Sequence, residues 1–82
     1  MTVVRYFAAA KAAAGVAEDP VEAGTLADVL SSVRARHDER FSAVLSVCSF
    51  LVDGAPVGTR PPERVVVGVD ALVDCLPPFA GG

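Results

Sequence analysis

The feature that most limits the possible folds of this 82-residue chain is one amphipathic helix pattern near its centre. Four apolar residues share the spacing of a single helical face: Leu26, Val29, Leu30 and Val33. Thr25 is a good N-cap, and Asp28 three residues later complements the free N–H groups and the helix dipole. Two arginines and His37 close the pattern, where cations favour a helix C-terminus and where we expect His37 to be solvated. The pattern predicts a helix over residues 26–37 with one apolar face to bury.

The segments around this helix have the composition of short β-strands. β-Branched and aromatic residues are concentrated in residues 2–7, 46–52, 65–67 and 71–76. Residues 16–23 contain Pro20, which an edge strand tolerates and a central strand does not. Asp53-Gly54 is a strong turn dipeptide, after which the chain can pair briefly with the preceding strand. We therefore expect a small sheet with residues 16–23 at its edge.

Two further segments complete the expected architecture. Residues 8–14 are almost pure alanine and end at Gly15, which favours a short helix with a left-handed C-terminal residue. Residues 38–42 are polar apart from Phe41, which we expect to plug the core. No linker and no internal repeat divides the chain. The sequence predicts an α+β fold in which a mixed sheet of about five strands packs on one main helix, with a short N-terminal helix.

Composition excludes several classes of function. The net charge is −3, and Lys11 is the single lysine, so no basic stripe is present to neutralise the phosphates of a nucleic acid. The longest uncharged run, residues 41–52, is far shorter than the ~20 apolar residues of a membrane-spanning helix. Residues 1–7 lack the pattern of a secretion signal. We therefore expect a cytoplasmic protein with no nucleic-acid partner and no membrane partner.

Few side chains are available for chemistry within the chain. His37 is the single histidine, and Cys48 and Cys75 are too widely spaced to form a recognisable metal site with it. Cys48 has neither a neighbouring base nor a helix N-terminus that would favour the thiolate. In a chain that is not secreted, we expect both cysteines to stay reduced and to pack as small apolar side chains. The sequence therefore predicts no metal site and no enzyme activity in the chain alone.

The final six residues differ from the rest of the chain, and we separate a folded domain, residues 1–76, from a tail, residues 77–82. The tail is Pro77, Pro78, Phe79, Ala80, Gly81 and Gly82. The two prolines stiffen the exit from the last strand. The two glycines place no side chain near the α-carboxylate, so the tail can enter a narrow channel in another protein. The alternative is a frayed terminus without function, which is common at glycine-rich ends.

Four segments together resemble the MoaD/ThiS family of sulfur carriers, which have the ubiquitin-like β-grasp fold. Residues 4–15 are similar to the strand and "FAxxRExxG" opening of that family, and residues 24–30 to its "G-T-hydrophobic-x-D-L-L" helix entry. Leu51 to Gly54 resembles its "VNG" segment. Leu76 to Gly82 matches the "LPPxxGG" ending of molybdopterin-synthase small subunits. The resemblance covers nearly the whole chain and is closer to the MoaD type than to the ThiS type.

This resemblance implies a protein that carries sulfur on its own C-terminus. An E1-like, MoeB-type enzyme would adenylate the Gly82 carboxylate with ATP, and a sulfur donor would convert it to a thiocarboxylate. A MoaE-type large subunit would then receive the tail, and the sulfur would pass to cyclic pyranopterin monophosphate. The chain itself would bind no cofactor. The alternatives are a ThiS-like carrier for another pathway, a ubiquitin-like modifier that forms isopeptide bonds, and a binding module whose glycines are never activated.

A face for the large subunit follows from strand alternation and from the resemblance. Alternation along the last strand predicts that Asp74 faces solvent and that Leu76, on the same side, forms an apolar root for the tail. The resemblance adds Phe7 and Pro56 to this face. Asp70 and Asp74 are the only charged side chains after residue 64, and the terminal carboxylate adds a third negative charge, so we expect a partner groove with basic residues.

Overall fold

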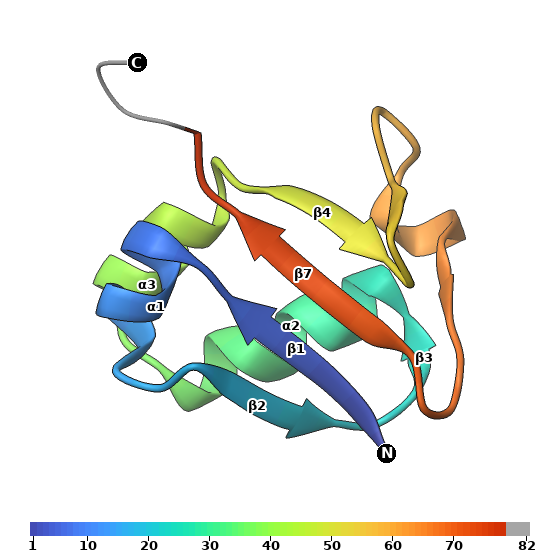
Figure 1. Cartoon of the computed structure of the whole chain (residues 1–82), viewed down its shortest axis with the longest axis horizontal. Coiled ribbons are helices and arrows are strands. Elements are labelled where there is room, and N and C mark those ends of the chain that lie inside the picture. Colours follow the sequence, from blue (N-terminus) through green and yellow to red (C-terminus); the bar gives the residue numbers. More distant parts are fainter. Residues whose placement is uncertain (79–82) are drawn as a thin grey trace.

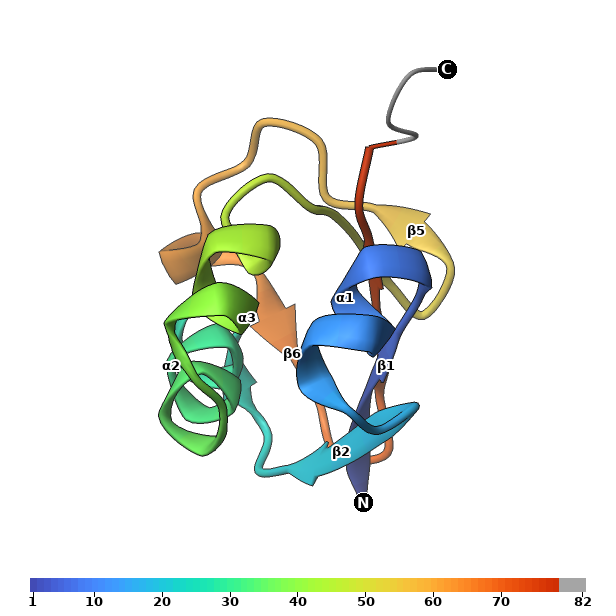
Figure 2. The ribbon, with the colours of Figure 1, turned by 90° about the vertical axis from the view of Figure 1, so that its left-hand side faces the viewer.

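The computed structural model describes residues 1–78 and consists, over that range, of three helices packed on one face of a five-stranded sheet (Figures 1 and 2). The order of the strands in the sheet is β2-β1-β7-β4-β5. Their bounds are β1 Thr2–Tyr6, β2 Glu18–Val21, β4 Ser49–Val52, β5 Ala55–Pro56 and β7 Leu72–Leu76. A second sheet pairs β3 (Gly24–Thr25) with β6 (Val66–Val67). The helices are α1 (Ala8–Ala14), α2 (Leu26–Arg36) and α3 (Glu39–Leu45), and a 3₁₀ turn, η1, covers Pro62–Arg64.

The two central strands of the large sheet, β1 and β7, run parallel, and each other pair in it is antiparallel. Strand β2 lies at one edge of the sheet. Pro20 has no N–H to donate, which an edge strand tolerates because one of its sides has no partner strand. A parallel pair requires a long connection between its strands, and here that connection contains the helices. The prediction of a mixed sheet of about five strands in an α+β fold is confirmed.

The main helix, α2, begins at the predicted cap. The Asp28 backbone N–H donates to Thr25 Oγ1 at 3.1 Å, and the Thr25 N–H donates to Asp28 Oδ2 at 3.0 Å. The bond from the Thr25 backbone holds the pKa of Asp28 below its usual value. All four residues of the predicted apolar face are buried. The helix ends at Arg36, one residue earlier than predicted, because His37 adopts an extended backbone conformation.

Residues 39–45 form a helix, α3, that the sequence analysis assigned to a polar connection. Asp38 caps it, because its Oδ1 accepts from the Phe41 N–H at 3.0 Å. Phe41 and Leu45, one turn apart, are both buried, so Phe41 fills the core as predicted. The predicted strand over residues 46–52 was too long, since β4 begins only at Ser49. No helix within residues 1–78 is long and apolar enough to cross a membrane.

The turns agree with the sequence prediction. Helix α1 ends where Gly15 takes a left-handed conformation, and the Gly15 N–H donates to the Lys11 carbonyl at 2.9 Å. Asp53 and Gly54 both have positive φ, as a two-residue hairpin between β4 and β5 requires. Asp53 Oδ1 also accepts from the Leu72 N–H at 2.9 Å. This bond ties the hairpin to β7, the strand that leads into the tail.

Candidate functional site

One face of the large sheet carries no helix and lies towards the viewer in Figure 1, with the helices behind it. Strand register places one residue from each strand in a row across this face: Pro56, Leu51, Asp74, Arg5 and Glu18. Tyr6 pairs with Cys75, so the next residues along these parallel strands, Phe7 and Leu76, also lie side by side. We call Arg5, Phe7, Leu51, Pro56, Asp74 and Leu76 the outer face. It includes the three predicted partner-binding residues.

An ion pair occupies the middle of the outer face. Arg5 Nε donates to Asp74 Oδ1 at 2.7 Å, and Arg5 Nη2 donates to Asp74 Oδ2 at 3.0 Å. The bond to Asp74 raises the pKa of Arg5. The Arg5 guanidinium also lies 5.6 Å from the centre of the Phe7 ring, a cation–π distance. The ion pair therefore joins the two parallel strands and contacts the most exposed aromatic ring of this face.

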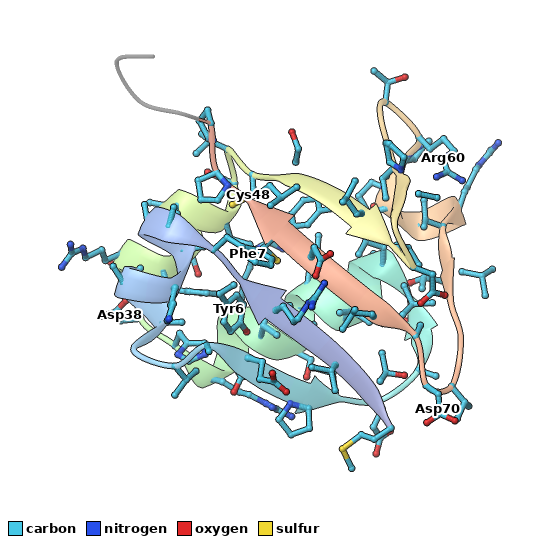
Figure 3. All side chains as sticks on the ribbon, in the orientation of Figure 1. Tyr6, Phe7, Asp38, Cys48, Arg60 and Asp70 are labelled. Carbon is cyan, nitrogen blue, oxygen red and sulfur yellow. The ribbon has the colours of Figure 1, made fainter. Side chains whose placement is uncertain are left out.

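The two aspartates expected to attract a basic partner are already paired. Asp74 is on the predicted side of β7, but it is 7% exposed because Arg5 covers it. Asp70 contacts the N-terminal ammonium of Met1 and lies at that end of the chain in Figure 3. The expectation of a solvent-facing Asp74 is therefore wrong, and the two paired aspartates give less support to the predicted basic partner groove. The third charge behind that prediction, the terminal carboxylate, lies outside the described residues, so the basic groove stays a prediction. The missing signal was Arg5, which becomes the neighbour of Asp74 only through the parallel pairing.

The predicted partner-binding residues share the outer face but do not form one cluster. Phe7 is 38% exposed where β1 leads into α1, and Leu76 beside it is half-buried. Pro56 is exposed on β5, two strands away from β7. Leu51 lies between them, because it pairs with both Pro56 and Asp74. Leu51 was not among the predicted partner-binding residues, because its place on this face depends on the register of β4 with β5 and β7.

Pro56 is held in place by the loop that follows it. Arg60 Nη2 donates to the Pro56 carbonyl at 3.0 Å, and Arg60 Nε donates to the Val57 carbonyl at 3.0 Å. Figure 3 shows Arg60 in this loop, far from Phe7. Of the predicted tail, Pro77 is half-buried and Pro78 is exposed. Phe79, Ala80, Gly81 and Gly82 lie outside the described residues.

Both cysteines are unpaired and differ in burial. Cys75 is fully buried on the helix side of β7, and burial raises its pKa to about 12. Cys48 is half-buried at the end of the sheet where the chain leaves β7, as Figure 3 shows, and burial raises its pKa as well. Its thiol donates to the Val44 carbonyl at 3.3 Å. Protonated thiols are poor nucleophiles, so these two fit a packing role.

His37 is not the solvated helix-terminal residue that the sequence analysis expected. Its Nε2 hydrogen-bonds to Asp19 Oδ2 at 2.7 Å, and the Tyr6 hydroxyl donates to the same oxygen at 2.7 Å. The ring lies 4.5 Å from that of Phe41, and the side chain is 13% exposed. Helix α3, which the sequence analysis did not predict, provides this aromatic neighbour. The cluster joins β1, β2 and the α2–α3 junction, and it lies behind the sheet rather than on the outer face.

The described residues offer no metal centre. Among residues 1–78, no three His, Cys, Asp or Glu side chains come together in a way that could hold a metal ion. What this part of the chain offers is an apolar surface around a neutralised ion pair, next to the strand that leads into the tail.

Solved structures with the same architecture include three from microorganisms. Small archaeal modifier protein 1 from Methanosarcina acetivorans has a TM-score of 0.82 at 20% identity, over 99% of this chain and 95% of that one. A putative molybdopterin-converting factor subunit 1 from Pyrococcus furiosus has a TM-score of 0.77 at 23% identity, over 94% and 95%. The complex of subunits 1 and 2 of molybdopterin-converting factor from Helicobacter pylori contributes a chain with a TM-score of 0.72 at 18% identity, over 99% and 97%. No protein-family model and no curated protein matches the sequence.

These likenesses extend over nearly the whole of both chains, and together with the strand order they decide the fold. The chain has the ubiquitin-like β-grasp fold. This confirms the fold that the sequence resemblance implied. One of the three proteins is named as a putative subunit 1 of molybdopterin-converting factor, and another chain comes from the complex of subunits 1 and 2 of that factor. At these identities the shared property is the fold, and function is a separate question.

Proposed function

We propose that this chain is a sulfur carrier that acts, with a Gly82 thiocarboxylate, as the small subunit of a molybdopterin synthase. One observation carries the proposal: Leu76 ends the central strand β7 of a β-grasp sheet, and the sequence Pro-Pro-Phe-Ala-Gly-Gly follows it directly. A rigid domain holds the root of the tail beside an apolar face, while the glycines leave the carboxylate open to another protein's active site.

The chemistry needs little from the carrier itself. An E1-like, MoeB-type enzyme would join the Gly82 carboxylate to the AMP part of ATP and release pyrophosphate. The outer sulfur of a donor protein's persulfide would displace AMP and form an acyl disulfide. A thiol would then reduce the S–S bond, becoming part of a disulfide with the donor, and release the thiocarboxylate. The thiocarboxylate would give its sulfur to cyclic pyranopterin monophosphate, and hydrolysis would return the carboxylate. In this scheme the partners bind the nucleotide and supply the acid–base groups, so the carrier is no enzyme alone and binds no cofactor.

The proposed partner is a MoaE-type large subunit. A chain with the same fold is solved in the complex of subunits 1 and 2 of the Helicobacter pylori factor, which supports a second subunit here. Phe7, Leu51 and Leu76 provide apolar contact area close to the tail. We place the carrier in the cytoplasm, where its two thiols would stay reduced.

A ubiquitin-like modifier is the second candidate. A structural neighbour from Methanosarcina acetivorans is named as a small archaeal modifier protein, and another modifier comes from Haloferax volcanii. In this case the activated Gly82 carboxyl would form an isopeptide bond with a lysine of a target protein. Both candidate functions begin with adenylation of the Gly82 carboxylate. They differ in the group that then reacts with it, which is a sulfur donor for the carrier and a lysine of a target protein for the modifier.

Intact-mass analysis of the protein from its native host tests the proposal and separates it from the alternatives. A polypeptide that ends at Gly82 with one sulfur in place of one oxygen is the expected result. A branched adduct would favour the modifier. An unmodified chain in cells with a working molybdopterin pathway would contradict both and favour a plain binding module.

A further inference from the structure

In the ion pair at the centre of the outer face, both oxygens of the Asp74 carboxylate are hydrogen-bonded, whereas several N–H groups of the Arg5 guanidinium are not. Both carboxylate oxygens of Asp74 accept from Arg5, and this carboxylate is almost fully buried. The guanidinium uses only Nε and one N–H of Nη2 for these bonds. The Arg5 side chain makes no other hydrogen bond within residues 1–78, and it is 42% exposed. In the free protein, water therefore binds the remaining N–H donors of Arg5.

These donors lie among the apolar residues of the same face. The Arg5 guanidinium is in contact with the Phe7 ring, and Leu76 is the neighbour of Phe7 on β7. Leu51 is the neighbour of Asp74 on the other side. A protein that covers Phe7 and Leu76 must therefore also remove water from Arg5. A buried donor that loses its water without gaining an acceptor weakens binding, so the partner has to offer an acceptor at this point.

The charges around Arg5 decide which acceptor fits. Asp74 already neutralises Arg5, and Glu18 on β2 lies opposite Arg5 in the register and adds a negative charge. Lys11 of α1 lines the same surface hollow as Arg5, Phe7 and Glu18, so the two cations balance the two carboxylates and the patch carries no net charge. A partner carboxylate would have to be buried here as an additional charge, whereas a neutral carbonyl oxygen would accept the free N–H groups without that desolvation cost.

We propose that Arg5 determines the specificity of the outer face and selects a partner protein that places a carbonyl oxygen opposite it inside an otherwise apolar contact. This inference rests on the proposed function, which supplies the partner, and goes beyond it by naming the contact. A partner that offers only apolar groups would leave the Arg5 donors unpaired. A partner that offers a lysine or arginine would meet the positive guanidinium. Carriers of this fold with an apolar residue in place of Arg5 would therefore not exchange freely with this chain.

The test is a binding titration between the full chain and the purified large subunit from the same organism. The variant is Arg5→Met with Asp74→Leu, because replacing both members of a buried pair by apolar residues avoids leaving Asp74 unpaired. The control is Arg34→Met, which changes an exposed arginine on α2, behind the sheet. We expect the double variant to remain folded by circular dichroism and to bind roughly tenfold more weakly, and the control to bind like the wild type.

Salt dependence separates the carbonyl acceptor from a charged one. For a neutral acceptor, the affinities of the wild type and of the double variant, which has the same net charge, should depend on salt concentration equally. A carboxylate acceptor would make the wild-type affinity more salt-dependent than that of the double variant and would overturn the choice of a carbonyl. A further variant, Arg5→Lys, retains N–H donors but not the planar fork, and should bind between the wild type and the double variant.

The failures can be told apart. If the wild type binds the large subunit and the folded double variant binds equally well, the role of Arg5 is wrong and the proposed function stands. If the wild type does not bind at all, the proposed partner is wrong and the inference falls with it. Self-association of the wild type in sedimentation, absent in the double variant, would assign the face to a second copy and also overturn the inference.

Discussion

Asp19 illustrates how much of this small structure depends on single polar side chains. One of its carboxylate oxygens accepts from both Tyr6 and His37, and Arg36 lies 3.8 Å from the other. Burial alone would raise the pKa of Asp19, but the hydrogen bonds from His37 and Tyr6 outweigh it and hold the pKa below its usual value. The ionised carboxylate therefore stabilises the folded state and holds β2 against β1 and the α2–α3 junction.

Replacing Asp19 by asparagine should cost about 1–3 kcal/mol of stability at pH 7, since a charged acceptor of two hydrogen bonds is lost. Because the folded pKa is lowered, this contribution is present above the unfolded pKa of about 4 and disappears as pH falls through the folded pKa. Urea unfolding of wild type and variant at pH 7 and at pH 2 measures it. A difference of equal size at both pH values would contradict the account, and Glu22→Gln, an exposed carboxylate, is the control.

The two cysteines should be dispensable for chemistry. A double Cys48→Ala and Cys75→Ala variant should lose about 1–3 kcal/mol through the smaller side chains and still accept sulfur at Gly82. In the native wild type, alkylation of Cys75 should be far slower than in the unfolded chain, because the thiol is buried and its pKa is raised to about 12. Mass spectrometry follows both reactions. Loss of sulfur loading by the folded variant would show that a thiol takes part.

Among the elements, the β4–β5 hairpin depends on backbone conformation at Gly54. The Cβ of an alanine at this position would have no other atom within 4 Å. The φ angle of Gly54 is +82°, however, and residues with a Cβ rarely adopt this backbone conformation. Gly54→Ala should therefore destabilise the protein by about 1–2 kcal/mol. Gly68 has equal space and no positive φ, so Gly68→Ala should have a smaller effect. Equal losses in thermal or urea unfolding would mean that strain at Gly54 is not the cause.

The elements also show why part of the fold was predictable from sequence. Helix α2 combines a capping box with a repeated apolar face, so its start and its buried side were predictable. Helix α3 has only seven residues and two buried apolar positions, too few for a period to be distinguished from a loop with one apolar residue. Strand β3 has two residues and exists because it pairs with β6, a partner that local sequence does not reveal.

At the scale of the whole molecule, the proposed role of the outer face in binding the large subunit can be tested by substitution. Changing Leu76 to aspartate should weaken binding of the large subunit on the order of tenfold or more, because a charge would enter an apolar contact. Circular dichroism should stay near wild type, since Leu76 is only half-buried. Val69→Asp, at an exposed valine before β7, is the matched control. An unfolded Leu76→Asp variant would show that Leu76 belongs to the core.

The candidate site was predictable only as far as local patterns extend. Alternation along β7 correctly placed Cys75 in the core and Asp74 and Leu76 on the opposite side. The ion pair and Leu51 depend on which strands become neighbours, and residues 69 positions apart in the sequence, such as Arg5 and Asp74, have no local signature. The roles of the tail and of the partner-binding residues stay predictions, as does the boundary after residue 76.

The most direct test of the central claim is sulfur loading of three versions of the chain by its activating enzyme, ATP and a sulfur donor. The versions are the wild type, a chain without Gly82, and a chain with one residue added after Gly82. Intact mass after the reaction should show a thiocarboxylate on the wild type and none on the other two, all three being folded by circular dichroism. Normal loading, or normal molybdopterin synthesis, by either altered chain would contradict the claim that the reaction takes place at the Gly82 carboxylate.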